Sequence, residues 1–242
     1  MHSIDPKSLR PSVDGSVRYR VCVSRLGAAR ELTHLAQIEL LRRTVLVSGL
    51  PVVMDKRRKK RRPKLSFGPA ISKGYESLAE YFDMELVSRV PAQEVISSLT
   101  DALEDGYAVR SVRRIPRYFP SLDASINVVR YTISGGFPDD QGASLAGFLS
   151  RAEIIIKKLK DGGAREERVD ARPLILEMVQ ESSRVLQLVL RFGPKKTIKP
   201  EALLAEWLPG PPSSPEAGEV SRFAVLRKEL LSETMRGELI AP

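Results

Sequence analysis

Apolar and polar residues alternate at several places along this chain, and this alternation constrains its fold more than any other feature. Val17, Tyr19, Val21 and Val23 alternate with arginine or cysteine near the start. The same period of two returns over residues 82–86 and 186–192. Because successive side chains of a strand point to opposite faces of a sheet, each segment predicts a half-buried β-strand.

Helical spacing separates the predicted strands of the first half. Apolar residues share one side of a predicted helix over 30–48, which Gly49 ends. A shorter helix is expected to open at Pro91, and a strand to follow over 107–115. Residues 17–118 therefore follow the order βαββαβ, which is typical of a ferredoxin-like unit.

The same order is expected to recur, incompletely, over residues 119–208. The predicted strands cover 125–134, 168–179 and 184–192, and the predicted helices cover 145–159 and 200–208. The predicted fold class is α+β, with two tandem ferredoxin-like units, of which the second is incomplete. Helix-rich repeats stay open as an alternative, because no internal sequence identity is visible.

Both ends of the chain look different from these two units. Residues 1–16 mix Pro, Ser, Asp and Gly without periodicity, which predicts a flexible arm. Proline and glycine over 209–219 predict a spacer. Residues 209–242 are therefore expected to form a linker and a C-terminal helix, which either docks on its own chain or awaits a partner.

A run of basic residues is the sharpest local feature. It supplies seven adjacent cations to a chain of net charge +9, so the rest of the chain is close to neutral. Seven neighbouring cations repel one another, which favours a solvated loop that a polyanion would neutralise. The predicted nucleic-acid-binding residues are Lys56, Arg57, Arg58, Lys59, Lys60, Arg61, Arg62 and Lys64. A plain solvated loop and docking on an acidic protein are the alternatives.

Composition argues against several kinds of chemistry. One cysteine cannot form an internal disulfide or a cysteine-ligated iron–sulfur cluster, and two histidines leave little for a zinc site, so no cofactor and no metal are expected in this chain. No apolar run approaches the roughly 18–20 residues that span a bilayer. No signal peptide is evident either, so we expect a cytoplasmic protein without a membrane partner.

His34 is the one candidate for proton transfer inside the predicted fold. A histidine titrates near neutral pH, and Arg30, one helical turn earlier, could hold a phosphate beside it. A structural hydrogen-bonding role is the alternative, because the sequence places neither a nucleophile nor a second base next to it.

Several short segments resemble the radical-SAM-linked (radical-SAM-associated) family of uncharacterised proteins, in its stand-alone form. They are Arg-Tyr-Arg at 18–20, Thr-His-Leu at 33–35, Gly-Leu-Pro at 49–51, Pro-Lys-Leu-Ser-Phe-Gly-Pro at 63–69, Gly-Tyr-Glu-Ser at 74–77 and Glu-Tyr-Phe-Asp at 80–83. Weaker similarity extends over most of residues 17–208. The basic run departs from the family pattern, so it is interpreted as a local affinity loop.

The resemblance implies an accessory protein rather than an enzyme. It implies a radical-SAM enzyme as partner, with the iron–sulfur cluster and S-adenosylmethionine in that partner, and RNA or a ribosomal component as a further partner. The family-like residues expected to line a groove are Arg30, His34, Ser66, Phe67, Gly68, Gly74, Glu76 and Ser77.

A second hypothesis is a metal-independent RNA-processing nuclease. Such nucleases of the CRISPR repeat-cleaving kind also pair two ferredoxin-like units, and His34 would be the general base here. The glycine-rich C-terminal loop expected of those enzymes is not evident in this sequence.

Overall fold

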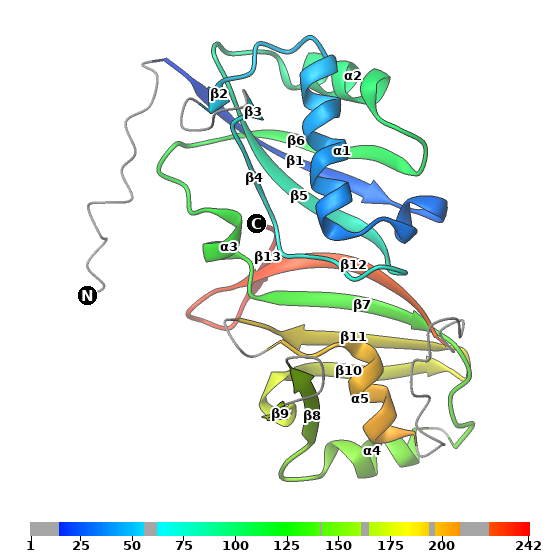
Figure 1. Ribbon diagram of the computed structural model, residues 1–242. Coiled ribbons are helices and arrows are strands. Elements are labelled where there is room, and N and C mark those ends of the chain that lie inside the picture. The colour runs from blue at the N-terminus through cyan, green and yellow to red at the C-terminus, as the bar shows by residue number, and fades with distance from the viewer. Residues whose placement is uncertain (1–14, 56–61, 141, 161–164, 194–196, 209–222) are drawn as a thin grey trace.

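The computed structural model describes residues 15–55, 62–140, 142–160, 165–193, 197–208 and 223–242 (Figure 1). Within these ranges the protein is a mixed α+β structure built on one nine-stranded sheet, so the predicted α+β class is confirmed. The flexible arm at 1–16, apart from its last two residues, and the spacer at 209–219 lie outside the described residues.

The sheet extends through the whole length of the protein. Its strands follow the order β10 (Ile175–Ser182), β11 (Val185–Arg191), β7 (Val128–Ser134), β12 (Ala224–Glu233), β5 (Glu76–Leu86), β1 (Val17–Arg25) and β6 (Tyr107–Ile115). Off this path, β4 (Leu65–Phe67) pairs with β5, and β13 (Leu239–Ile240) pairs with β12. The early strands gather at one end and the later ones at the other, and the two groups meet where β5 pairs with β12 (Figure 1).

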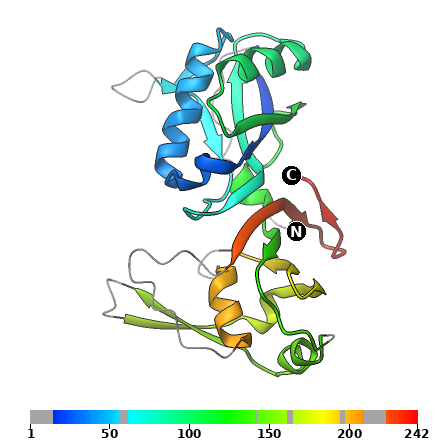
Figure 2. The same cartoon turned by 90° about the vertical axis from the view of Figure 1, so that its right-hand side faces the viewer.

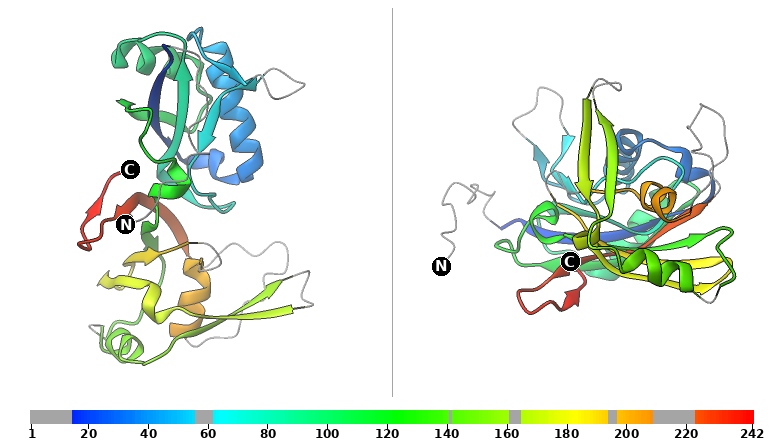
Figure 3. Two further views of the ribbon diagram at one scale, coloured as in Figure 1. Left: turned by 90° about the vertical axis from the view of Figure 1, so that its left-hand side faces the viewer. Right: turned by 90° about the horizontal axis from the view of Figure 1, so that it is seen from below.

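Helices pack against one face of this sheet (Figure 3). They include α1 (His34–Val47), α2 (Ala92–Ala102) and α5 (Pro200–Trp207). On β1, the buried Tyr19, Val21 and Val23 face the core formed with α1 and α2. The predicted strand is confirmed as β1, but it is buried on both faces rather than half-buried, because Arg20, Cys22 and Ser24 between these positions are also buried.

Shorter elements complete the fold. They are α3 (Leu122–Ser125), α4 (Ala143–Leu149), the 3-10 turns η2 (Gly27–Glu31) and η4 (Arg172–Leu174), and the strand pairs β2 (Met54–Asp55) with β3 (Arg62–Pro63) and β8 (Ile155–Lys160) with β9 (Arg165–Asp170). A second core lies beneath α5, where the Phe137 ring stacks on Trp207 and Phe223 with centroids 5.9 and 5.5 Å apart. The helix predicted to open at Pro91 is confirmed as α2, and the helix predicted over 200–208 as α5. The strands predicted over 107–115 and 184–192 are confirmed as β6 and β11.

The predicted helix over 30–48 begins too early. Helix α1 starts at His34, with the Thr33 hydroxyl capping it by accepting from Ala36 N–H at 3.2 Å. Before it lies η2, whose carbonyls at Ala29 and Arg30 accept hydrogen bonds from the buried Arg25 guanidinium. Because these carbonyls accept from a side chain, the regular backbone hydrogen bonds of the helix begin only after them.

Two predictions in the second half are also wrong. The helix predicted over 145–159 ends at Leu149, and the chain becomes strand β8 from Ile155, because consecutive isoleucines fit a pleated sheet better than a helix. The strand predicted over 168–179 is broken into β9 and β10 by η4, which contains Pro173.

The C-terminal helix is the largest error. Residues 224–233 form strand β12, which lies between β7 and β5 in the sheet. It pairs with β7 along most of its length but with β5 only at Leu226↔Glu76 and Arg227↔Ser77. The last described segment therefore joins the two ends of the sheet (Figure 2).

Candidate functional site

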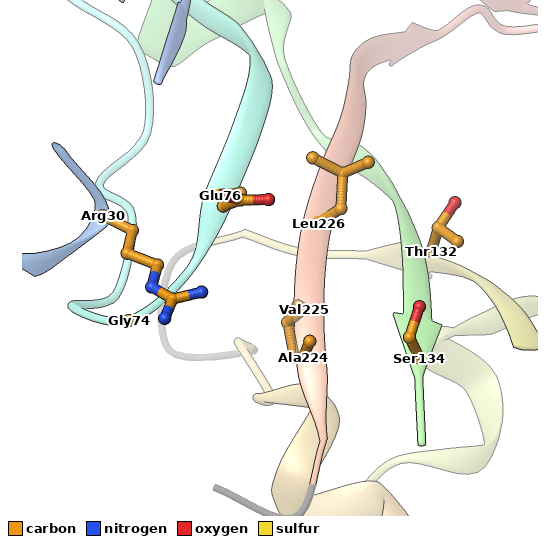
Figure 4. Close-up of a pocket in the computed structure, with 8 residues that line it drawn as sticks. All are labelled: Arg30, Gly74, Glu76, Thr132, Ser134, Ala224, Val225 and Leu226. Atoms are coloured by element: carbon orange, nitrogen blue, oxygen red, sulfur yellow. The ribbon is translucent and has the colours of Figure 1, made fainter. Parts of the chain in front are cut away.

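Three of the predicted groove residues meet at a small pocket beside β12. Arg30, Gly74 and Glu76 line a cavity of about 150 Å³, together with Thr132, Ser134 and residues 224–226. Arg30 reaches from η2 toward β12, while the two hydroxyls stand on β7 across the pocket (Figure 4). Backbone contacts fix this arrangement: Gly74 N–H donates to the Arg30 carbonyl, and Gly27 N–H donates to Glu76 Oε1, each at 2.8 Å.

Ser66, Phe67 and Gly68 lie elsewhere, along β4 and just after it. Ser66 is exposed, Phe67 packs on the Phe82 ring with centroids 6.1 Å apart, and Gly68 N–H donates to the Tyr81 carbonyl at 2.8 Å. None of these contacts reaches the pocket. The family-like residues therefore do not form one continuous groove.

A buried ionic network lies between α1, β1, β5 and β12. The Arg25 guanidinium donates to Gln37 Oε1 at 2.9 Å, and Gln37 Nε2 donates to Glu80 Oε2 at 2.7 Å. The other oxygen of Glu80 accepts from Arg227, whose Nη1 also donates to the carbonyls of Pro69 and Ala70 at 3.2 Å. The loop after β4 is thereby attached to the C-terminal strand.

Glu80 remains ionised in this network. Burial raises the pKa of its carboxyl group, but the Arg227 guanidinium and hydrogen bonds from Ser77 and Gln37 outweigh burial and hold the pKa below its usual value. Ser77 is fully buried and also accepts from Ala79 N–H at 3.1 Å. These residues therefore stabilise the packing of α1, β1, β5 and β12 through charged hydrogen bonds, and we do not assign them a role in proton transfer.

His34 lies at the border of this network. Among the described residues its buried Nδ1 makes no hydrogen bond, and burial lowers the pKa of the imidazole, an effect that nearby Glu80 opposes. Tyr107, also close to Arg25 and Glu80, has a buried hydroxyl that no described residue contacts by a hydrogen bond, and burial raises its pKa to about 12. A neutral imidazole with a free nitrogen can accept a hydrogen bond or a proton.

Most of the basic run, Lys56 to Arg61, lies outside the described residues. Its end is described: Arg62 pairs with Asp55 across β2 and β3, and its guanidinium lies 3.3 Å from Glu39 Oε1. Lys64 Nζ lies 2.5 Å from Glu85 Oε1 on β5. Asp55, which precedes the run, and Arg62, its last residue, are therefore paired in the β2–β3 hairpin. The contact of Lys64 with β5 attaches this hairpin to the sheet.

A second basic surface was missed by the sequence interpretation. Arg110, Arg113, Arg114 and Arg117 are all exposed on β6 and in the loop after it, and we call them the arginine strip. The exposed Tyr118 and the half-buried Phe119 follow directly. The signal that could have revealed the strip is that residues 107–122 contain four arginines and no acidic residue.

Metal-binding groups, the single cysteine and apolar helices are the remaining candidate features of the described part of the chain. There, no group of three or more His, Cys, Asp or Glu side chains could hold a metal ion. The single cysteine, Cys22, is 5% exposed, and burial raises the pKa of its thiol to about 11. No described helix is both long enough and apolar enough to cross a bilayer.

Comparison with known protein families identifies a match over most of the chain. Residues 18–200 match a family described as "Uncharacterized protein conserved in bacteria (DUF2344)". No curated protein matches the chain. The expected uncharacterised family is confirmed, whereas its description names no link to radical-SAM enzymes, so that link stays a prediction.

Proposed function

Because the chain belongs to the DUF2344 family of uncharacterised bacterial proteins, we propose its function from its own residues: it is an accessory protein that binds RNA and delivers it to a partner enzyme. The observation that carries this proposal is the hairpin of β2 and β3, which holds both ends of a seven-cation run. Such a concentration of charge is neutralised best by a polyanion.

The hairpin is positioned well for this role. Val53 N–H donates to the Glu85 carbonyl and Lys64 N–H donates to the Val53 carbonyl, each at 2.8 Å, so the base of the hairpin is held against β5. Arg62 and Lys64 each contact one carboxylate. The six residues between Asp55 and Arg62 are all lysine or arginine, so they concentrate positive charge in a short segment of the sequence. Phosphate groups of RNA fit this charge without requiring a particular base sequence.

We interpret each half of the sheet as a ferredoxin-like unit. The strand orders β4-β5-β1-β6 and β10-β11-β7-β12 each correspond to strands two, three, one and four of a βαββαβ sequence. The second order depends on β12, so in this interpretation the second unit is completed by the C-terminal strand. The fold alone assigns no function, and the proposal depends on the charges.

Replacing residues 56–62 with serine tests RNA binding. With five hairpin cations on single-stranded RNA, these contacts are expected to contribute about −3.5 to the slope of log affinity against log salt, so the slope of the serine variant should be less steep than that of the wild type by about this amount. A variant with lysine at all seven positions keeps the charge and serves as the matched control. Equal salt dependence for the serine variant and the wild type would contradict the assignment of the hairpin.

The partner enzyme is proposed from the family-like segments, which resemble radical-SAM-linked proteins. In this proposal the partner holds the iron–sulfur cluster and S-adenosylmethionine, and this chain supplies only binding and orientation. The test is co-purification of the tagged protein with a co-expressed radical-SAM enzyme, with and without RNA. Failure to associate at micromolar concentrations in both conditions would refute the partnership.

A nuclease is the second candidate, favoured by one observation: the imidazole of His34 is neutral and its Nδ1 is unpartnered. Cleavage of RNA in the presence of a metal chelator, lost in His34→Ala but kept in Leu35→Ala at the next, exposed position of α1, would support it. RNA that stays intact after prolonged incubation would exclude it.

A further inference from the structure

The arginine strip lies at one edge of the sheet. Within the described residues β6 pairs only with β1, so its outer side faces solvent. Arg113 is opposite Arg20 in the register, and Arg114 is opposite Tyr19, whose side chain enters the helix-covered core. Neighbouring arginines of the strip therefore point to both sides of the edge.

The charge of the strip is not neutralised within the described part of the protein, where no carboxylate forms an ion pair with any of its four arginines. Other arginines of the sheet are different. Arg20 contacts Asp83 at 2.7 Å, Arg130 contacts Glu229 at 2.9 Å, and Arg191 contacts Glu233 at 2.7 Å. Since paired arginines are the rule on this sheet, four unpaired ones in eight residues mark a surface that is suited to an external anion.

Aromatic rings accompany these charges. Tyr118 is 86% exposed, which is unusual for a large aromatic side chain and leaves both faces of its ring accessible. The Phe119 ring lies beside the guanidinium groups of Arg20 and Arg113, with centroid distances of 5.5 and 6.0 Å. Planar cations and rings at adjacent positions are what unpaired bases stack on.

The loop that carries the two rings is held in place. Arg18 Nη1 donates to the Phe119 carbonyl at 2.7 Å, and Arg20 Nη2 donates to the Pro120 carbonyl at 3.2 Å. Phe119 N–H also donates to the Pro116 carbonyl at 3.0 Å and closes a turn. Tyr118 is thus presented by a preorganised loop, which reduces the entropy lost when a ligand binds.

We propose that the arginine strip, with Tyr118 and Phe119, is a second RNA-binding surface that takes an unpaired segment, its phosphates contacting the guanidinium groups and its bases stacking on the rings. All four cations are arginines, which bind phosphate through two parallel hydrogen bonds and also stack on planar groups. Unpaired RNA uses both features at once, with its phosphates on the cations and its bases on the exposed ring. The inference rests on the proposed function only in that both surfaces take RNA.

The strip and the basic hairpin lie at opposite edges of one four-strand run. Strand β4, next to the hairpin, and β6 are three strand spacings apart in the order β4-β5-β1-β6, or about 14 Å. One RNA chain can therefore contact both surfaces across the sheet, so the strip adds affinity and also sets the direction in which the strand leaves the hairpin.

The test measures binding of an unstructured 20-nucleotide oligouridine. The strip variant replaces Arg110, Arg113, Arg114 and Arg117 with serine. The control variant replaces Arg151, Arg168, Arg184 and Arg236 with serine; these residues are also exposed and lie outside β6 and its loop, so both variants lose four charges. If all four strip residues contact phosphate, the slope against log salt falls by about 2.8 and affinity at about 0.1 M salt falls about 10²- to 10³-fold, while the control changes less than tenfold.

Substitutions of Tyr118 test separately whether an RNA base stacks on its ring. Loss of one stacked base in Tyr118→Ala is expected to weaken binding about 5- to 100-fold without changing the salt slope, whereas Tyr118→Phe keeps the ring and the affinity. Because Tyr118 is exposed, neither substitution is expected to alter thermal unfolding, which is measured alongside.

The possible results distinguish a failure of the proposed function from a failure of the second RNA-binding surface. Wild-type protein without salt-dependent affinity for oligouridine would refute the proposed function itself. If the wild type binds and the strip variant matches the control, the second surface is wrong while the function stands. If the wild type binds a 20-residue polyglutamate as tightly as oligouridine and both weaken equally in the strip variant, the strip is a protein-docking surface and the RNA assignment is overturned.

Discussion

Arg227 on β12 and Glu80 on β5 form a buried ion pair, Nε to Oε1 at 3.1 Å, although 147 positions separate them in the chain. The pair lies where the two ends of the sheet meet, and β5 and β12 share only two register positions there. Side-chain contacts at this joint therefore supplement a short backbone pairing.

Arg227→Met is expected to destabilise the protein by about 3–5 kcal/mol, because it leaves the Glu80 carboxylate buried without its cation. Urea denaturation measures this change in the free energy of unfolding. The double variant Arg227→Met with Glu80→Leu should lose less than the single one, since the Glu80 carboxylate is no longer left buried without its cation. Arg236→Met, at an exposed position, is the control, and a loss at Arg227 no larger than at Arg236 would contradict the prediction.

Ending the chain at Leu208 is expected to prevent folding of both halves, and not merely to shorten the protein. The truncation removes β12, so β7 loses one neighbour and Glu80 loses Arg227. We expect aggregation or loss of a cooperative thermal transition, since exposed strand edges pair with other chains. A chain ending at Thr234 keeps β12 and should melt cooperatively. Cooperative melting of the shorter chain would show that β12 is dispensable.

Regular alternation predicted strands such as β1 and β11 from the sequence, whereas β12, whose alternation is interrupted, was missed. In β12 the register shifts between Arg227 and Glu229, so Val225 and Leu230 both face the core although they lie five positions apart, an odd spacing that would put them on opposite faces of a regular strand. This bulge replaces the period of two with a spacing that resembles a helix. No local pattern could have revealed the error, because only the pairing with β7 and β5 specifies the strand.

Protein stability should fall as the pH decreases from about 6.5 toward the folded-state pKa of His34. Burial lowers that pKa, so the unfolded chain binds a proton in this window while the folded protein does not. The slope contributed is at most about 1.4 kcal/mol per pH unit. Denaturation at several pH values, compared with His34→Gln, measures it. An identical pH profile for both proteins would mean that His34 titrates normally.

Cys22 is expected to resist thiol reagents in the native protein. Its side chain is buried and the pKa is raised to about 11, so about one thiol in a thousand is ionised at pH 8. Reaction with a colorimetric disulfide reagent should occur only after denaturant is added. Ser88→Cys, which places a second thiol at an exposed position, is the positive control. Rapid labelling of the wild type would show that this part of β1 opens readily.

The candidate site was predictable only in part, because contacts between residues far apart in the chain, like the strand pairing of β12, leave no local pattern in the sequence. Charge runs are visible in a sequence, so the basic run could be named as a predicted binding loop, whereas the arginine strip depends on β6 being an edge strand. The ionic network of Arg25, Gln37, Glu80 and Arg227 depends on four elements meeting, which no spacing encodes. Pocket residues Arg30 and Glu76 were named in advance, but Thr132 and Ser134 come from the other half of the chain.

The position of β12 has a consequence for biosynthesis. A ribosome makes β5 and β7 long before residues 224–233, yet these two strands flank the place that β12 fills. Until that segment emerges, the nascent chain has two unsatisfied edges and a carboxylate without its cation. The gap at the centre of the sheet closes only after residues 224–233 have been made, and until then the growing chain depends most on protection from neighbours.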